Sequence, residues 1–202
     1  MNRFNRLIET IYRSGCYIEE GGQAIEELIS SGEPALDAFL GVRKHPPASD
    51  QHPRDLADSL SVVLQDFAKH IPDAIINRFE AGQLGDFETY WALGSATDKR
   101  SVEVLIGGLK SKEKYSRWAA AEALVRRRSK KGVPALIEAL KDRSTDVKSS
   151  VVFGMRAWSD LRRPEAAPAL ERVVANKAIR KHSPGLHKAA EDVIRLIENE
   201  VK

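Results

Sequence analysis

Apolar residues recur along this chain in units of similar length. One anchor position sets the register, and successive anchors are 39, 30, 31 and 34 residues apart. The anchors are Leu36, Ile75, Leu105, Leu136 and Leu170. Ahead of the fourth anchor, Trp118, Ala121 and Val125 lie at i, i+3 and i+7, which is the stripe of an amphipathic helix. Each unit is therefore predicted to contain two helices, with the anchor in the second.

The predicted helix pairs cover most of the chain. They span 19–31/33–43, 53–69/71–82, 86–96/100–110, 114–128/132–141 and 145–159/164–175. Single helices at 2–15 and 184–200 are expected to cap the ends. Because one pair cannot cover both of its apolar faces, the pairs should stack on their neighbours. The predicted fold is all-α, an α-α superhelical solenoid of about five helical hairpins.

The solenoid is expected to form a single domain over 1–202. Its parts are an N-terminal cap (1–18), five helix pairs (19–175) and a C-terminal cap (183–202). The proline-rich stretch 44–53 lengthens one turn without dividing the chain. Pro134 follows the break at Lys131-Gly132, and it fits the first turn of a helix, where its missing N–H would have no partner anyway.

Charge is distributed unevenly between the two halves. Residues 1–109 hold 10 Lys/Arg and 17 Asp/Glu, a net charge of −7. Residues 110–202 hold 22 Lys/Arg and 12 Asp/Glu, a net charge of +10. This asymmetry suggests a directional field and a polyanion as one candidate partner of the C-terminal half.

Several function classes are disfavoured by what the sequence lacks. Cys16 is the only cysteine, which excludes an intrachain disulfide, and it is expected to be a small buried side chain. The N-terminal stretch has no signal-peptide pattern, and no segment approaches the ~20 apolar residues of a membrane span. The expected location is therefore the cytoplasm, with no membrane partner.

Metal and cofactor sites are not predicted either. The histidine pairs His45/His52 and His182/His187 lack the i, i+4 spacing of a helical zinc site. There is also no Gly-x-Ser-x-Gly motif and no phosphate-binding glycine loop. We therefore expect no cofactor, no small-molecule substrate and no enzymatic activity.

Three motifs in the fourth unit and at the start of the fifth indicate a family. They are Ser116-Arg117-Trp118-Ala119-Ala120-Ala121-Glu122-Ala123-Leu124, Val133-Pro134-Ala135-Leu136 and Asp142-Arg143-Ser144-Thr145-Asp146-Val147-Lys148. Together they resemble the HEAT-like repeat named after phycobilisome lyases, which has an ARM-like superhelical fold. The resemblance is good over 86–175 and weaker over 19–82, and Lys148 stands where the family usually has arginine. It implies binding far more often than catalysis.

The leading functional hypothesis is a non-enzymatic scaffold or adaptor for a protein partner, since bacterial HEAT-like proteins of this size include subunits, adaptors and toxin-neutralising partners. The alternative is nucleic-acid binding, in DNA binding or repair, through a basic edge formed by the turns between paired helices. The predicted edge consists of Lys99, Arg100, Arg126, Arg127, Arg128, Lys130, Lys131, Arg162 and Arg163. These residues could equally be solvated cations that offset helix dipoles.

A catalytic interpretation exists but is disfavoured. HEAT-type alkylpurine DNA glycosylases place an aromatic residue and a carboxylate on one helix face, and Trp118 and Glu122 have that i, i+4 spacing, with Arg156 one repeat further on. Those enzymes are expected to use aspartate rather than glutamate. Trp118 also aligns with Phe87, which is expected to lie in the core. Bilin-lyase activity is implied by the family name alone.

Overall fold

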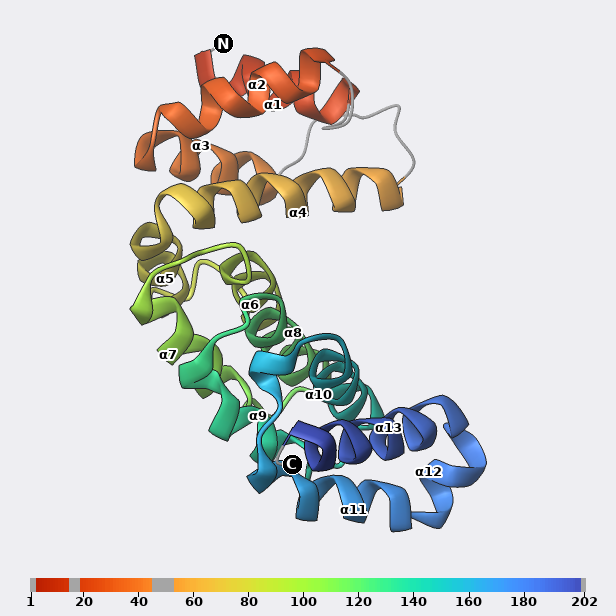
Figure 1. The fold of residues 1–202 in the computed structure, drawn as a ribbon. Coiled ribbons are helices and arrows are strands. Elements are labelled where there is room, and N and C mark those ends of the chain that lie inside the picture. The colour runs from red at the N-terminus through yellow and green to blue at the C-terminus, as the bar shows by residue number, and fades with distance from the viewer. Residues whose placement is uncertain (1–2, 15–18, 45–52, 201–202) are drawn as a thin grey trace. The chain divides into compact units, whose positions relative to one another are not determined.

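A computed structural model describes residues 3–14, 19–44 and 53–200 of the chain (Figure 1). All regular secondary structure in these residues is helical. Their contacts form two compact units, residues 1–101 and 102–202. Cys16, His45 and His52 lie outside the described residues, so the expectations for them stay predictions.

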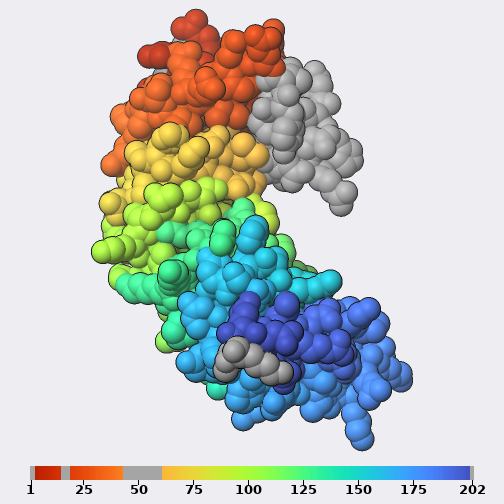
Figure 2. Space-filling model, viewed as in Figure 1, coloured from red at the N-terminus to blue at the C-terminus, as the bar shows by residue number. Residues whose placement is uncertain are grey.

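The described residues of the N-terminal unit contain six complete helices. They are α1 (Arg3–Ser14), α2 (Glu19–Ser30), α3 (Glu33–Lys44), α4 (Pro53–His70), α5 (Pro72–Glu80) and α6 (Asp86–Leu93). Helix α1 packs on α2 and α3, α2 contacts α4, and α4 contacts α6. In Figure 2 the visible surface of this unit passes through colours in chain order, from the red and orange of α1 and α2 to the yellow of α4. The first helices of the pairs therefore stack in sequence.

The core of this unit is continuous from one helix pair to the next. Phe39 of α3 and Phe67 of α4 are both fully buried, and their ring centroids lie 6.2 Å apart. Between α5 and α6, Phe79 and Tyr90 meet edge to face at 5.7 Å. Aromatic pairs in this geometry stabilise a core beyond the area that they bury. The N-terminal unit is thus a packed stack of helix pairs.

The C-terminal unit begins within α7 (Lys99–Gly108), and its part described by the structure continues with six helices. They are α8 (Lys114–Arg126), α9 (Val133–Ala139), α10 (Thr145–Ala157), α11 (Ala167–Ala175), α12 (Lys177–His182) and α13 (Pro184–Glu200). Helix α8 packs on α10, and α13 covers both α10 and α11. Short 3-10 turns at 130–132, 159–161 and 164–166 join first helices to second helices.

Small residues bring α8 and α10 close together. Ala119, Ala120 and Ala123 of α8 are completely buried. A Cβ added to Gly154 of α10 would lie 2.5 Å from Cγ1 of Val125, a distance that real Cβ atoms do not adopt. Gly154 therefore sets the closest approach of the two helices.

The helix pairs predicted from the sequence are confirmed, with one addition. Pro134 lies in the first turn of α9, as expected. Helix α12, between the fifth pair and the C-terminal cap, was not predicted, because its six residues bury only Ile179. A local indication of α12 in the sequence was Asn176. Its side chain accepts hydrogen bonds from the backbone N–H groups of Ala178 and Ile179, as N-cap residues do. The fold is all-α, with helix hairpins stacked in chain order within each unit, as in α-solenoids.

Candidate functional site

The predicted basic edge contains cations that pair with carboxylates of the neighbouring repeat. Arg100, at the start of α7, donates hydrogen bonds to Asp73 at 2.9 Å and to both carboxylate oxygens of Glu80 at 3.0 Å. Both partners lie on α5, the preceding second helix. The hydrogen bonds to Asp73 and then to Glu80 raise the pKa of Arg100 above its ordinary value. Arg100 thus pairs with two acids of α5 within the N-terminal unit.

Lys131 repeats this arrangement one unit later. Its Nζ donates to Glu103 of α7 at 2.5 Å, and this bond lowers the pKa of Glu103. Asp73 and Glu103 occupy equivalent places, two residues before their anchors. The next equivalent place is Pro134, so the following repeat offers no acid there. The ion pair of Lys131 with Glu103 is therefore not repeated at the equivalent place of the next unit.

The cations further along the predicted edge use other partners. Nε of Arg128 lies 3.0 Å from Asp160, and the guanidinium lies 4.6 Å from the ring centroid of Trp158. Arg162 pairs with Glu200 of α13 and donates to the carbonyl oxygens of Met155 and Arg156 at 3.1 and 3.3 Å. Its side chain is only 10% exposed. Arg162 therefore caps carbonyl groups at the C-terminal end of α10.

The other positions of the predicted edge differ in exposure. Lys99, Arg126 and Lys130 are exposed, whereas Arg127 and Arg163 are half-buried. Arg163 donates to the backbone carbonyl of Arg162 at 2.6 Å. Arg100, Arg128, Lys131 and Arg162 of the predicted edge thus form ion pairs within their own unit. Binding at this edge stays a prediction.

A buried ion pair joins α8 to the turn after α9. Arg117 donates to both carboxylate oxygens of Asp142, at 2.7 and 3.1 Å, and to the carbonyl oxygens of Ser111 and Lys112. The two side chains are 7% and 11% exposed. Burial alone would raise the pKa of Asp142, but hydrogen bonds from Arg117 and the Ser144 N–H outweigh it and lower the pKa. Both residues belong to the family motifs found in the sequence, and this contact gives them a structural role.

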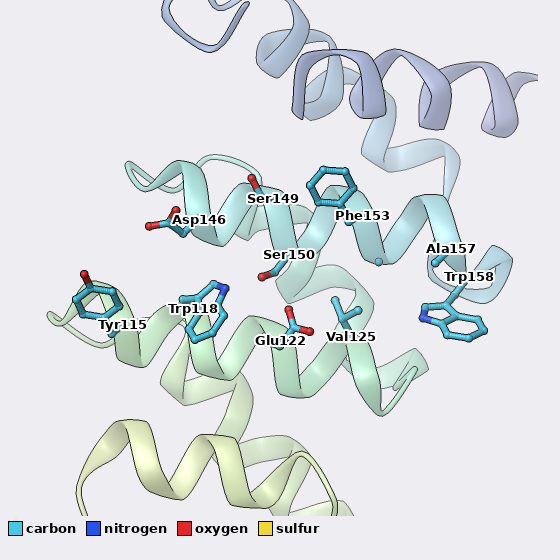
Figure 3. Close-up of a pocket in the computed structure, with 11 residues that line it drawn as sticks. Tyr115, Trp118, Glu122, Val125, Asp146, Ser149, Ser150, Phe153, Ala157 and Trp158 are labelled. Atoms are coloured by element: carbon cyan, nitrogen blue, oxygen red, sulfur yellow. The ribbon is translucent and has the colours of Figure 1, made fainter. Parts of the chain in front are cut away.

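An open hollow of about 600 Å³ lies between α8 and α10 (Figure 3). Its volume is in the range of ligand-binding clefts. The residues that line it are Tyr115, Trp118, Glu122, Val125, Asp146, Ser149, Ser150, Phe153, Gly154, Ala157 and Trp158. In Figure 3, Trp118 and Glu122 of α8 and Ser150 of α10 lie in the space between the helices, with Tyr115 and Asp146 toward one end and Trp158 at the other. We call this feature the aromatic hollow.

Three exposed aromatic residues distinguish the aromatic hollow from the rest of the surface. Tyr115, Phe153 and Trp158 are 63%, 45% and 42% exposed. Among the described residues, the one other large apolar side chain exposed to this degree is Phe87, at 41%. The expectation that Phe87 lies in the core was therefore wrong. Clustered exposed apolar side chains mark binding surfaces more often than isolated ones do.

Two cations of the chain lie over aromatic rings that line the aromatic hollow, and each also pairs with a carboxylate. Lys114 lies 4.4 Å from the ring centroid of Tyr115 and 3.3 Å from Asp146. The hydrogen bond to Asp146 is the main cause of a raised pKa at Lys114. At the other end, Arg128 lies over the ring of Trp158 and pairs with Asp160. At each end of the hollow, the positive charge is therefore offset by the negative charge of a neighbouring carboxylate.

Of the residues considered for catalysis, the structure brings two together and separates the third. Trp118 and Glu122 both line the aromatic hollow. Arg156 does not, and its Nε lies 3.7 Å from Asp192 of α13. Tyr115, Phe153 and Trp158 were not among the residues predicted from the sequence to bind a partner. Phe153 could have been found, since it is a large apolar residue off the buried stripe of α10, which includes Val147, Val151 and Met155.

Comparison with known proteins then identifies the repeats. A family model described as HEAT repeats matches residues 87–156 and 102–183. The match supports HEAT-like repeats over residues 87–183. HEAT repeats are helical scaffolds that commonly bind proteins, and the aromatic hollow lies wholly inside this HEAT segment.

A solved structure and the curated proteins complete the comparison. The crystal structure of an engineered protein from the Northeast Structural Genomics Consortium is similar at 17% identity, with a TM-score of 0.46 over 98% of each chain. No curated protein matches the chain.

Two further observations concern the described residues. No group of three or more His, Cys, Asp and Glu side chains in them has an arrangement that could hold a metal ion. None of their helices is long and apolar enough to cross a bilayer. His182 lies exposed at the end of α12, and His187 lies 3.9 Å from Glu191 on α13.

Proposed function

We propose that this protein is a non-enzymatic scaffold that binds a protein partner through the aromatic hollow of its HEAT segment. The observation that supports this most directly is the clustering of Tyr115, Phe153 and Trp158, exposed, around one hollow. Tyrosine, tryptophan and phenylalanine are enriched at protein interfaces, and tryptophan and tyrosine are frequent among the few residues that dominate the binding energy. We expect this surface to be covered when the partner is bound.

Rigid placement of the rings also supports the proposal. Tyr115 and Phe153 lie on helices α8 and α10, which are held together at Gly154. Trp158 is the C-cap residue of α10, where its N–H donates to the carbonyl of Gly154. A preformed surface loses less conformational entropy on binding than a mobile one. The hollow therefore suits recognition without rearrangement.

The test is site-specific cross-linking in cells of the source organism. A photoreactive benzoylphenylalanine at position 153 should cross-link one partner, and native mass spectrometry of the purified complex should give a fixed stoichiometry. Phe153→Asp should remove the complex, because a charge would be buried against the partner. Ala178→Asp, which adds the same charge to exposed α12, is the matched control.

The proposal fails if the partner binds Phe153→Asp as well as it binds the unaltered protein. It also fails if a photoreactive group at Lys181, exposed on α12 outside the hollow, captures the partner as efficiently as one at position 153. A cytoplasmic location stays a prediction of the sequence.

Nucleic-acid binding is the second candidate, favoured by positive charge that reaches beyond the predicted edge. A smaller hollow of about 250 Å³ is lined in part by Lys141, Lys148 and Arg172, and exposed Arg180 and Lys181 lie on α12. Binding to a phosphate backbone would weaken steeply as salt is added. Co-purifying nucleic acid, detected as a raised ratio of 260 to 280 nm absorbance, would favour this candidate over the scaffold.

A further inference from the structure

We propose that the smaller hollow lined by Lys148 and Arg172 binds one carboxylate side chain of the protein partner. We call this feature the basic hollow; its volume is about 250 Å³, and Lys141 also lines it. The inference rests on the proposed function for the identity of the partner, and it adds a second contact to the aromatic hollow. It specifies an acidic residue that the partner must present.

The basic hollow is lined by charges of one sign. Lys141 after α9, Lys148 of α10 and Arg172 of α11 contribute to its wall, and no carboxylate is among the described residues that line it. Leu140 and Val173, which line it as well, are buried. A cleft with like charges over an apolar, weakly polarisable floor concentrates the electric field and attracts ions of the opposite sign. The basic hollow is therefore suited to an anion.

Arg172 is the cation of the basic hollow that is open to a new partner. It is exposed, and within the described residues its guanidinium takes part in no hydrogen bond or ion pair. No acid lies three or four residues from it along the chain, where positions 168, 169, 175 and 176 are proline, alanine, alanine and asparagine. A guanidinium binds a carboxylate through two parallel hydrogen bonds, as Arg117 binds Asp142 in this protein. Arg172 can offer the same pair of donors to a carboxylate from outside.

Asn176 supplies a second donor whose orientation is fixed. Its side-chain oxygen accepts hydrogen bonds from the backbone N–H groups of Ala178 and Ile179, at 3.0 and 3.1 Å. These bonds set the direction of the amide, and its NH2 group keeps two N–H donors. Asn176 lines the basic hollow together with Arg172. A carboxylate in the hollow can therefore accept hydrogen bonds from a charged group and a neutral group at once.

The surroundings of the basic hollow favour a single carboxylate over a nucleic-acid strand. Glu138 pairs with Lys141 at 2.5 Å, and Glu171 is exposed next to Arg172 in the sequence. Because a nucleic-acid strand carries a charge at every nucleotide, these two acids would repel the phosphates on either side of one that entered the hollow. The methylene groups of a glutamate would also match the apolar floor. The expected ligand is therefore one acidic residue with uncharged neighbours.

The direct test uses short peptides, with side chains of the basic hollow as reporters. The probe is acetyl-Gly-Ser-Glu-Ser-Gly-amide, and its matched control contains glutamine, which has the shape of glutamate without the charge. Binding is followed by NMR at the Nε–H signal of Arg172 and the side-chain NH2 signals of Asn176, with the backbone amides of α2 as the reference. We expect the glutamate peptide to shift these signals with a dissociation constant of about 1 mM, and the glutamine peptide to bind about tenfold more weakly.

Variants then assign the effect to one guanidinium. Arg172→Gln should weaken the glutamate peptide about tenfold, since it removes the charge and the paired donors. Arg195→Gln, which removes an equal charge from the exposed face of α13, should bind the peptide like the unaltered protein. Equal binding of both peptides, or unchanged binding by Arg172→Gln, would overturn the inference. So would a short oligothymidylate that shifts the Arg172 signal at lower concentration than the glutamate peptide does in about 150 mM salt, because the hollow would then be a nucleic-acid contact.

The full partner separates this inference from the proposed function. We expect Phe153→Asp and Arg172→Gln both to weaken the complex, Phe153→Asp the more strongly. A partner that fails to bind Phe153→Asp but binds Arg172→Gln like the unaltered protein would refute the carboxylate site and leave the scaffold standing. A partner that ignores Phe153→Asp but is weakened by Arg172→Gln would refute the aromatic hollow and keep the carboxylate site.

Discussion

The cations of the predicted basic edge and the aromatic residues of the hollow differ in how far their side chains are engaged by the rest of the protein. Arg100, Arg128, Lys131 and Arg162 are conspicuous in the sequence, yet each pairs with a carboxylate of its own unit. Tyr115 and Phe153 were not predicted as binding residues, yet both are left exposed around one hollow. Sequence charge therefore overstates what is available to a partner, because much of it is neutralised internally.

This contrast predicts where substitutions will cost stability and where they will cost binding. The ion pairs should matter to folding, and increasingly so as the side chains become more buried. The aromatic hollow should matter to folding very little. Three measurements test this division, in order of decreasing effect.

Arg117→Met should be the most destabilising of the substitutions considered. It leaves the carboxylate of Asp142, whose side chain is 11% exposed, without its bidentate partner, and breaking such a buried pair costs about 3–5 kcal/mol. The measurement is the free energy of unfolding from urea titration. The matched control is Lys131→Met, which breaks an exposed pair and should change stability only slightly. Equal losses in the two variants would show that burial is not what separates them.

Arg162→Met should cost about 1–2 kcal/mol. The carbonyl oxygens of Met155 and Arg156 would lose a charged donor at the end of α10, and hydrogen bonds to charged groups are worth more than neutral ones. Phe153→Ser is the control from the aromatic hollow, and it should change stability by about 0.5 kcal/mol or less. If Phe153→Ser proved the more destabilising variant, the hollow would be a structural feature rather than a binding surface.

The smallest effect is expected in the acid dependence of stability. The pKa of Asp142 is lower in the folded protein than its ordinary value, so the carboxylate stabilises the fold above that ordinary value. This contribution is lost as the pH falls through the folded pKa, below about pH 4. Urea midpoints between about pH 5 and pH 2.5 should therefore fall more steeply in the unaltered protein than in Asp142→Asn. Parallel curves would mean that other carboxylates control the acid response.

Local patterns explain why the helices could be predicted. Apolar spacing, the anchor residues and prolines such as Pro134 all act within a few turns of backbone. Helix α12 was missed for the same reason, since its sequence buries only Ile179 and has no stripe to detect. The boundaries of the fifth pair differed because a 3-10 turn at 164–166 precedes α11.

The sequence by itself determined the helix pairs, their order and the repeat family of residues 87–183. Only the tertiary structure decided which charges were already paired and which aromatic residues were left exposed. Arg100 pairs with Asp73, which is 27 residues away in the sequence, and Lys131 pairs with Glu103, which is 28 residues away. The aromatic hollow likewise exists only where α8 and α10 meet. The physical reason is that helix formation depends on neighbours along the chain, whereas pairing and exposure depend on neighbours brought together by stacking.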